Sequence, residues 1–148
     1  SAKEFFALVK SHLKDDGVMV VNMNVRGTKE GNINQYLSDT IGSVFTTEVI
    51  VDVAGSSNRE LFASDDPDIG KNLTKHTGEL TNANLKNMMQ EVASNLTEYQ
   101  KGNYILTDDQ APVELLGMQV IDELIKDEVQ YYKDIYKERG IKGLMESL

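Results

Sequence analysis

Cysteine is absent from this chain of 148 residues, and that absence excludes several kinds of site at once. Without a thiol there is no disulfide framework, no thiolate zinc centre and no cysteine nucleophile. Long apolar runs are also missing. The longest, Val18 to Val21, is far shorter than the ~20 residues that a membrane-spanning helix needs.

Positive charge is scarce, since 15 Lys and Arg face 24 Asp and Glu, for a net charge of -9. An acidic surface repels nucleic acid and anionic membranes, so we expect neither as a partner. The chain opens on Ser1-Ala2 and passes directly into a helical pattern, with no charged-then-apolar leader. We therefore expect a cytoplasmic protein and a fragment of something longer.

The common signatures of catalytic and metal sites are missing as well. Neither GxGxxG nor GxxxxGK[ST] occurs, and His12 and His76 have no partner at a diagnostic spacing. Asp65, Asp66 and Asp68 could hold a divalent cation, but the EF-hand pattern is absent, which favours a solvated acidic loop. We expect no metal and assign no catalytic residue.

Hydrophobic periodicity predicts alternating helices and strands. Helices are expected over 3–14, 32–45 (with Asn32 as N-cap), from Thr81 to Gly102 and from Pro112 to about Arg139, and strands over 18–23, 47–53 and 59–64. Residues 65–78 have no firm assignment. The nearly continuous apolar run in the first strand is typical of a strand that is covered on both faces.

The connections predict the topology of a short mixed sheet of about three strands. The helix over 32–45 makes the first two strands a right-handed βαβ unit. The turn-rich link over 54–58 is too short for a crossover, so the second and third strands form an antiparallel hairpin. We expect the first strand, 18–24, at an open edge of the sheet.

One polar stretch borders the predicted last helix: Leu106-Thr107-Asp108-Asp109-Gln110-Ala111-Pro112-Val113-Glu114. Its acids Asp108, Asp109 and Glu114 lie at a helix start, where carboxylates complement the helix dipole. The alternative is a cation-binding rim suited to an amine. The sequence leaves both interpretations open.

Two parts of the chain resemble a known family. Residues 5–22, with the turn Leu13-Lys14-Asp15-Asp16-Gly17, look like the helix and fifth strand of the class I S-adenosylmethionine-dependent methyltransferase fold, and residues 43–64 resemble its last helix and its sixth and seventh strands. The Thr107 to Glu114 stretch is similar to one in spermidine synthase-like proteins. The resemblance implies an α/β, partial Rossmann-like three-layer sandwich. Residues 3–64 would form its C-terminal half, and 65–148 a mainly helical extension packing on it in a single compact unit.

The resemblance also implies a function for the parent protein. Such a transferase uses decarboxylated S-adenosylmethionine or S-adenosylmethionine, with a polyamine as acceptor, but its Gly-rich loop and catalytic aspartates have no counterpart here. We expect no cofactor in this fragment, which would be inactive alone. The candidate substrate-binding residues are Asp108, Asp109 and Glu114, with Asn22 and Asn24 at the carboxyl end of the first strand, where the ligand crevice of an open α/β sheet lies.

A second interpretation comes from another class of protein. The lack of a complete catalytic constellation is equally typical of a non-catalytic module that forms homodimers through a sheet edge or the C-terminal helix. The sequence does not say which amine the parent uses, or whether it transfers an aminopropyl or a methyl group.

Overall fold

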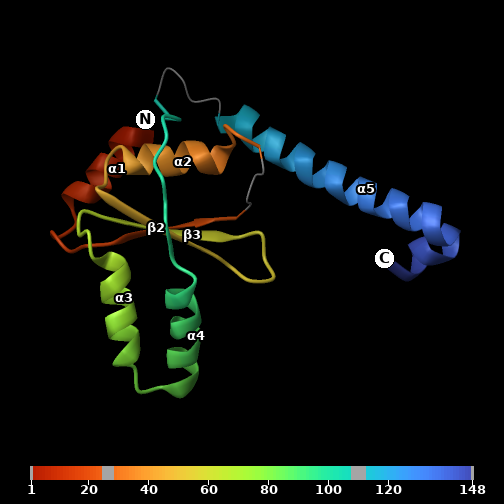
Figure 1. The fold of residues 1–148 in the computed structure, drawn as a ribbon. Helices are drawn as coiled ribbons and strands as arrows, with labels where there is room; N and C mark the ends of the chain where they lie inside the picture. Colours follow the sequence, from red (N-terminus) through yellow and green to blue (C-terminus); the bar gives the residue numbers. More distant parts are fainter. Residues whose placement is uncertain (1, 25–28, 108–112, 148) are drawn as a thin grey trace. The chain divides into compact units, whose positions relative to one another are not determined.

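The structure is a computed structural model, and it describes residues 2–24, 29–107 and 113–147 (Figure 1). The chain divides into two compact units, residues 1–111 and 112–148, which are treated separately below. The elements in order are α1 (Ala2–Ser11), β1 (Met19–Met23), α2 (Ile33–Gly42), β2 (Thr47–Asp52), β3 (Arg59–Ser64), α3 (Ile69–Gly78), α4 (Ala83–Ser94), β4 (Thr97–Glu98) and α5 (Val113–Ser147).

The first unit is built on a four-stranded sheet in the order β1-β3-β2-β4, and every pairing in it is antiparallel. The α/β class is confirmed, as are the β2–β3 hairpin and the position of β1 at the sheet edge. The sheet has four strands where about three were predicted, and its pairing is antiparallel throughout rather than mixed. Strands β1 and β2 run parallel to each other, but β3 lies between them and pairs antiparallel with both.

The hydrophobic core lies on the face of the sheet that α1 and α2 cover (Figure 1). It consists of the buried side chains of Phe6, Met23, Ile41, Phe45, Leu61 and Ala63. Alternation along the strands brings Leu61 and Ala63 to this face, where Met23 of β1 joins them. Asn32 caps α2 as predicted, because its side-chain oxygen accepts hydrogen bonds from the N–H groups of Asn34 and Gln35.

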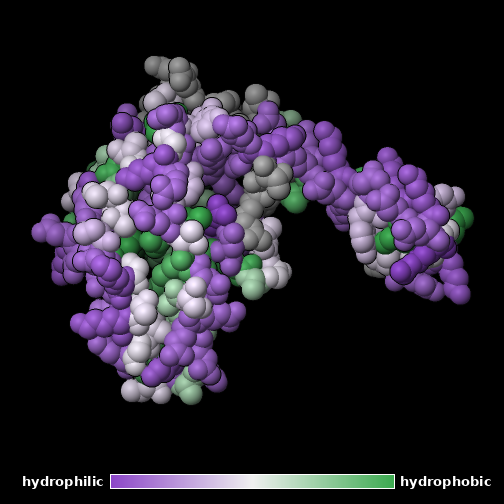
Figure 2. Space-filling model, in the orientation of Figure 1, coloured by the Kyte–Doolittle hydropathy of each residue, from purple (hydrophilic) through white to green (hydrophobic). Residues whose placement is uncertain are grey.

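Helices α3 and α4 lie on the opposite face of the sheet (Figure 1). They leave part of β1 open, since Val20 is 54% exposed and Val18 is 41% exposed. The prediction that this strand is covered on both faces is therefore wrong for the face that carries Val18 and Val20. Figure 2 shows hydrophobic residues reaching the surface over the sheet, above α3 and α4 in that view.

Helices α3, α4 and α5 differ from what the sequence pattern predicts. Helix α3 forms where no assignment was made, and α4 is capped by Asn82 rather than Thr81, with the Leu85 N–H donating to its Oδ1 at 3.0 Å. Helix α4 ends at Ser94, and the predicted continuation to Gly102 instead forms β4 and an extended segment. Helix α5 continues past Arg139 to Ser147, with a bend at Gly140, whose φ of 64° suits glycine.

Candidate functional site

The carboxyl ends of β1 and β2 lie at the same end of the sheet, and polar side chains gather there. Asn22 is exposed and pairs in register with Glu60 of β3. Asn24 is also exposed, and its backbone carbonyl accepts a hydrogen bond from Ser57 Oγ at 3.1 Å. The two predicted amides, two positions apart at the end of β1, are therefore both accessible to solvent.

An ion pair lies at the same end of the sheet but on the other face from Asn22, because Arg59 is in register with Met23. Arg59 donates to both carboxylate oxygens of Asp52, from Nε to Oδ1 at 2.7 Å and from Nη2 to Oδ2 at 3.1 Å. This bidentate geometry occupies the guanidinium and leaves Glu60 as a further carboxylate at the same sheet end. Amide and carboxylate oxygens of this kind can accept hydrogen bonds from an ammonium group.

The other predicted site residues belong elsewhere. Asp108 and Asp109 lie outside the described residues. Glu114 lies in the first turn of α5, in the second compact unit, whereas Asn22 and Asn24 belong to the first. The structure thus leaves Asn22 and Asn24 exposed at the end of β1, and it describes no side chain for the predicted acids.

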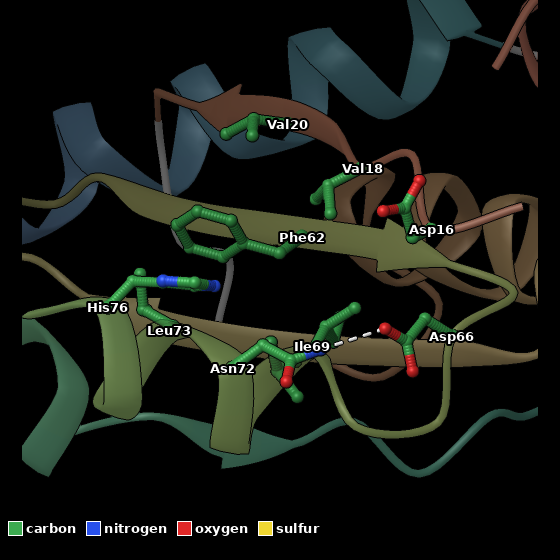
Figure 3. Close-up of a pocket in the computed structure, with 10 residues that line it drawn as sticks. Asp16, Val18, Val20, Phe62, Asp66, Ile69, Asn72, Leu73 and His76 are labelled. Atoms are coloured by element: carbon green, nitrogen blue, oxygen red, sulfur yellow. Dashed lines mark hydrogen bonds between the residues drawn. The ribbon is translucent and has the colours of Figure 1, made fainter. Parts of the chain in front are cut away.

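A groove that the sequence analysis missed runs along the open part of the sheet (Figure 3). It encloses a cavity of about 410 Å³ between β1, β3 and α3. Its apolar wall is formed by Val18, Val20, Phe62, Ile69 and Leu73, with Asp16 and Asp66 at one end and His76 at the other. The alternation that places Val18 and Val20 on one face was the sequence signal for it.

The acidic stretch at the start of α3 is occupied by protein partners. Asp65 forms an ion pair with Lys10 at 2.7 Å, and the hydrogen bond from Lys10 holds the pKa of that carboxyl below its usual value. Asp66 accepts from the Asp68 N–H at 2.8 Å and from Asn72 Nδ2 at 2.9 Å. In the described residues, no group of His, Asp or Glu is arranged to hold a metal ion.

A second group that the sequence analysis missed is a buried polar cluster between α2 and the extended segment after β4. Asp39 of α2 is only 1% exposed. Its carboxylate accepts three hydrogen bonds, from the Tyr99 hydroxyl at 2.8 Å and from the N–H groups of Gly102 and Tyr104, both at 2.9 Å. Burial raises the pKa of Tyr99, and its hydrogen bond to Asp39 raises it further.

Glu48 of β2 lies in the same cluster and is also 1% exposed, but neither of its carboxylate oxygens has a hydrogen-bond partner in the described residues. Burial raises its pKa to about 8, against the opposing effect of Lys101, while Asp39 adds to the rise. Lys101 donates instead to the carbonyls of Phe45 and Thr46, at 2.8 and 2.9 Å. Glu48 is therefore largely protonated at neutral pH, because burial disfavours its charged form.

Among the described residues, no helix is both long enough and apolar enough to cross a bilayer.

Comparison with known proteins gives one curated relative. Over its whole length, the chain is similar to a Bifidobacterium longum (strain NCC 2705) protein named probable polyamine aminopropyl transferase, with 43% identity over 166 aligned residues. The chain spans 37% of that protein's length. No protein-family model and no solved structure matches it. The resemblance to spermidine synthase-like proteins that was predicted from the sequence is thereby confirmed.

Proposed function

From this likeness to a polyamine aminopropyl transferase, we propose that the chain is the C-terminal α/β part of a spermidine synthase-like enzyme. The whole enzyme would transfer an aminopropyl group from decarboxylated S-adenosylmethionine to a polyamine such as putrescine. The observation that carries the proposal is 43% identity across the full length of this chain.

The aminopropyl transfer requires a base and a binding site for the nucleoside. An amine nitrogen of the acceptor attacks the aminopropyl carbon next to the sulfonium, a new C–N bond forms, and the C–S bond breaks with its electron pair going to sulfur. A neutral thioether nucleoside leaves, and the amine gives one proton to a base. In this proposal the base and the nucleoside-binding loop come from the rest of the enzyme, because this chain lacks both patterns.

The part that we assign to this chain is on the acceptor side. Asn22 and Asn24 are exposed at the carboxyl end of β1, where their amide oxygens can accept hydrogen bonds from an ammonium group. Asp108, Asp109 and Glu114 stay candidate acceptor-side carboxylates on the strength of the sequence pattern alone. The net charge of -9 favours the approach of a polycation.

The open edge of the sheet has a role in the same proposal. Among the described residues, β1 pairs with β3 alone, so the outer row of its backbone N–H and C=O groups is available. We assign this row to a strand from the rest of the enzyme, whose chain would also cover Val18 and Val20. The proposal thus gives a reason for an apolar edge that a free-standing domain would be expected to protect.

A chimera tests the proposal directly. This chain would replace the matching segment of the Bifidobacterium relative, and the formation of spermidine from putrescine and decarboxylated S-adenosylmethionine would be measured. We expect turnover within about tenfold of the intact relative, and none from this chain alone. A chimera that folds but binds no S-adenosyl ligand, beside an active intact relative, would overturn the proposal.

A matched pair of variants in the chimera tests the acceptor side. Asn22→Ala together with Asn24→Ala should raise the KM for putrescine by about 3- to 30-fold, as expected for the loss of one or two hydrogen bonds to a charged group. Glu98→Ala, on the far strand β4, should leave KM unchanged. An equal effect of both changes would count against a binding role for the amides.

The non-catalytic homodimerising module remains the second candidate. It is favoured by the exposed apolar face of α5, which includes Ile121, Ile125 and Val129. An inactive chimera combined with a stable dimer of the chain would support this candidate over the transferase.

A further inference from the structure

The groove beside β1 continues into a second cavity. This cavity measures about 570 Å³ and lies between the sheet and α4, where Met88, Met89 and Val92 line it. Both cavities are also lined by Val20 and Phe62, so they join into one trough across β1 and β3. The floor of the trough is accessible to solvent, since Val20 is 54% exposed.

Strand alternation orders the apolar and polar side chains along the trough. Val20 of β1 is in register with Phe62 of β3. Two residues further along β1, Asn22 is in register with Glu60. Cross-strand partners share one face of a sheet, and so do residues two apart in a strand, so these four side chains lie on the same face. The apolar floor therefore ends in a polar pair at the carboxyl end of β1.

Carboxylates lie at both ends of this apolar floor. Asp16 and Asp66 lie at the end that Figure 3 shows, and Glu60 lies at the other end. Among the described residues that line the trough, none is Lys or Arg. A ligand that suits this lining has an aliphatic body and a cationic group at each end, because ammonium groups pair with carboxylates and methylene groups bury apolar area.

The length of the trough selects among such ligands. From Glu60 to Ser64, β3 spans about 13 Å at ~3.3 Å per residue, and Asp66 lies two residues beyond. Putrescine has five bonds between its two nitrogens, so its length cannot exceed about 8 Å at ~1.5 Å per bond. Putrescine therefore reaches one end only, whereas a linear amine about twice as long reaches carboxylates at both ends.

We propose that the trough binds a long linear amine, with its cationic ends at Asp16 and Glu60 and its methylene chain between them over Phe62. The acceptor role of this amine rests on the proposed function, which places an ammonium group at Asn22. Selection of the acceptor by its length is what the trough adds. The chain that the proposed function places over the edge of β1 would close the trough from outside.

Calorimetric titration of the chain with linear diamines of four, eight and twelve methylenes tests this selection. Each diamine carries the same two charges, so its attraction to a chain of net charge -9 is the same across the series. Only the apolar area that the trough buries grows with length. We expect the dissociation constant to fall by about tenfold or more from the shortest diamine to the longest.

A matched pair of double variants tests the position of the site. Asp16→Asn together with Glu60→Gln should weaken binding of the longest diamine by about tenfold or more, because both cationic ends lose a carboxylate. Asp15→Asn together with Glu98→Gln makes the same change in net charge at two exposed positions outside the lining. This control should leave the dissociation constant within about twofold. The urea midpoint of each variant shows whether it is folded.

Two results would overturn the proposal: dissociation constants that do not depend on the length of the diamine, or an equal loss of binding in both double variants. Neither result depends on turnover, so this proposal and the proposed function fail separately. Length-dependent binding by a chain whose chimera is inactive would support the trough and contradict the transferase. An active chimera combined with length-independent binding would do the reverse.

Discussion

Glu48 shows how far one position can depart from what its residue type suggests. A glutamate in a strand of Val and Ile is expected to face water, yet Glu48 shares a sheet face with Ile50 and is paired in register with the buried Ala63. Its carboxylate is neutral at pH 7 because burial disfavours the charged form. The signal in the sequence was its spacing of two residues from Ile50, which places both side chains on one face.

The raised pKa of Glu48 predicts how stability depends on pH. The group titrates at about 8 in the folded chain and at its ordinary value of 4.5 when unfolded. Between these values the folded state retains a proton that the unfolded state releases, so this contribution to stability is present below pH 4.5 and is lost as pH rises to about 8. Glu48→Gln should flatten the change in the urea midpoint between pH 5 and 8.

A matched control separates burial from charge. Glu98→Gln removes the same charge from an exposed site on β4 and should leave the pH dependence as it is in the unaltered chain. A Glu48→Gln variant whose midpoint still falls by the same amount over that range would contradict the assignment.

Gly42 provides a second prediction at the level of a single residue. A Cβ at this position would run into Oε2 of Glu48 and would lie 3.0 Å from the Lys101 stem. Gly42→Ala should therefore destabilise the chain by about 1–3 kcal/mol, although alanine is the better helix former. Gly70→Ala in α3 has no atom within 4 Å of the new Cβ and should stabilise by about 0.5–1 kcal/mol. Urea unfolding of both variants measures the difference.

Among the elements, the segment over residues 95–102 is the one that sequence periodicity assigns most incorrectly, since it was predicted as the end of a helix. Tyr99 fits the apolar stripe of the predicted helix, but its hydroxyl is bonded to Asp39, and the N–H of Leu106 donates to Thr40 Oγ1 at 2.8 Å. A Cβ on Gly102 would lie 2.6 Å from Asp39 Oδ2, so glycine allows the close approach. These bonds to α2 outweigh the helix preference of the local sequence.

Asp39 is expected to hold this segment in place. Asp39→Ala would leave the N–H groups of Gly102 and Tyr104 without their acceptor, at a cost of about 2–4 kcal/mol in the free energy of unfolding. Tyr99→Phe removes one bond and leaves these two, so it should cost about 0.5–1.5 kcal/mol. Hydrogen exchange at Gly102 and Tyr104 should accelerate in the first variant only. Unchanged protection there would refute the role of Asp39.

At the scale of the whole molecule, the first unit contains the four-stranded sheet and the main core cluster of the described residues. All strand pairings and every member of the main core cluster fall within residues 1–111. Cooperative unfolding depends on such contacts, so the stability of this unit should reside within it.

Truncation after Ala111 tests this division. We expect residues 1–111 to unfold in urea as one transition, with a midpoint within about 0.3 M of the full chain and a proportionally smaller slope, since less surface is exposed on unfolding. The truncated chain should also be monomeric if α5 is the dimer interface. Loss of the cooperative transition would show that the second unit is needed for folding.

The sequence by itself determined the α/β class, the β2–β3 hairpin, the N-cap at Asn32 and the likeness to spermidine synthase-like proteins. These features depend on short-range patterns, namely periodicity, turn length and motif residues, which the chain carries locally. Asn22 and Asn24 could be chosen as candidate site residues for the same reason, because strand ends are visible in the sequence.

Only the tertiary structure decided the rest. The pairing of β3 with β1 joins residues 36 to 44 positions apart in the chain (Met23 with Arg59, Met19 with Ala63). The hydrogen bonds that bury Asp39 join it to residues 60 to 65 positions away. Such contacts follow from which surfaces meet after folding, and local propensity carries no record of them. The groove beside β1 is open for the same physical reason, because the helices that fold against the sheet leave that edge uncovered.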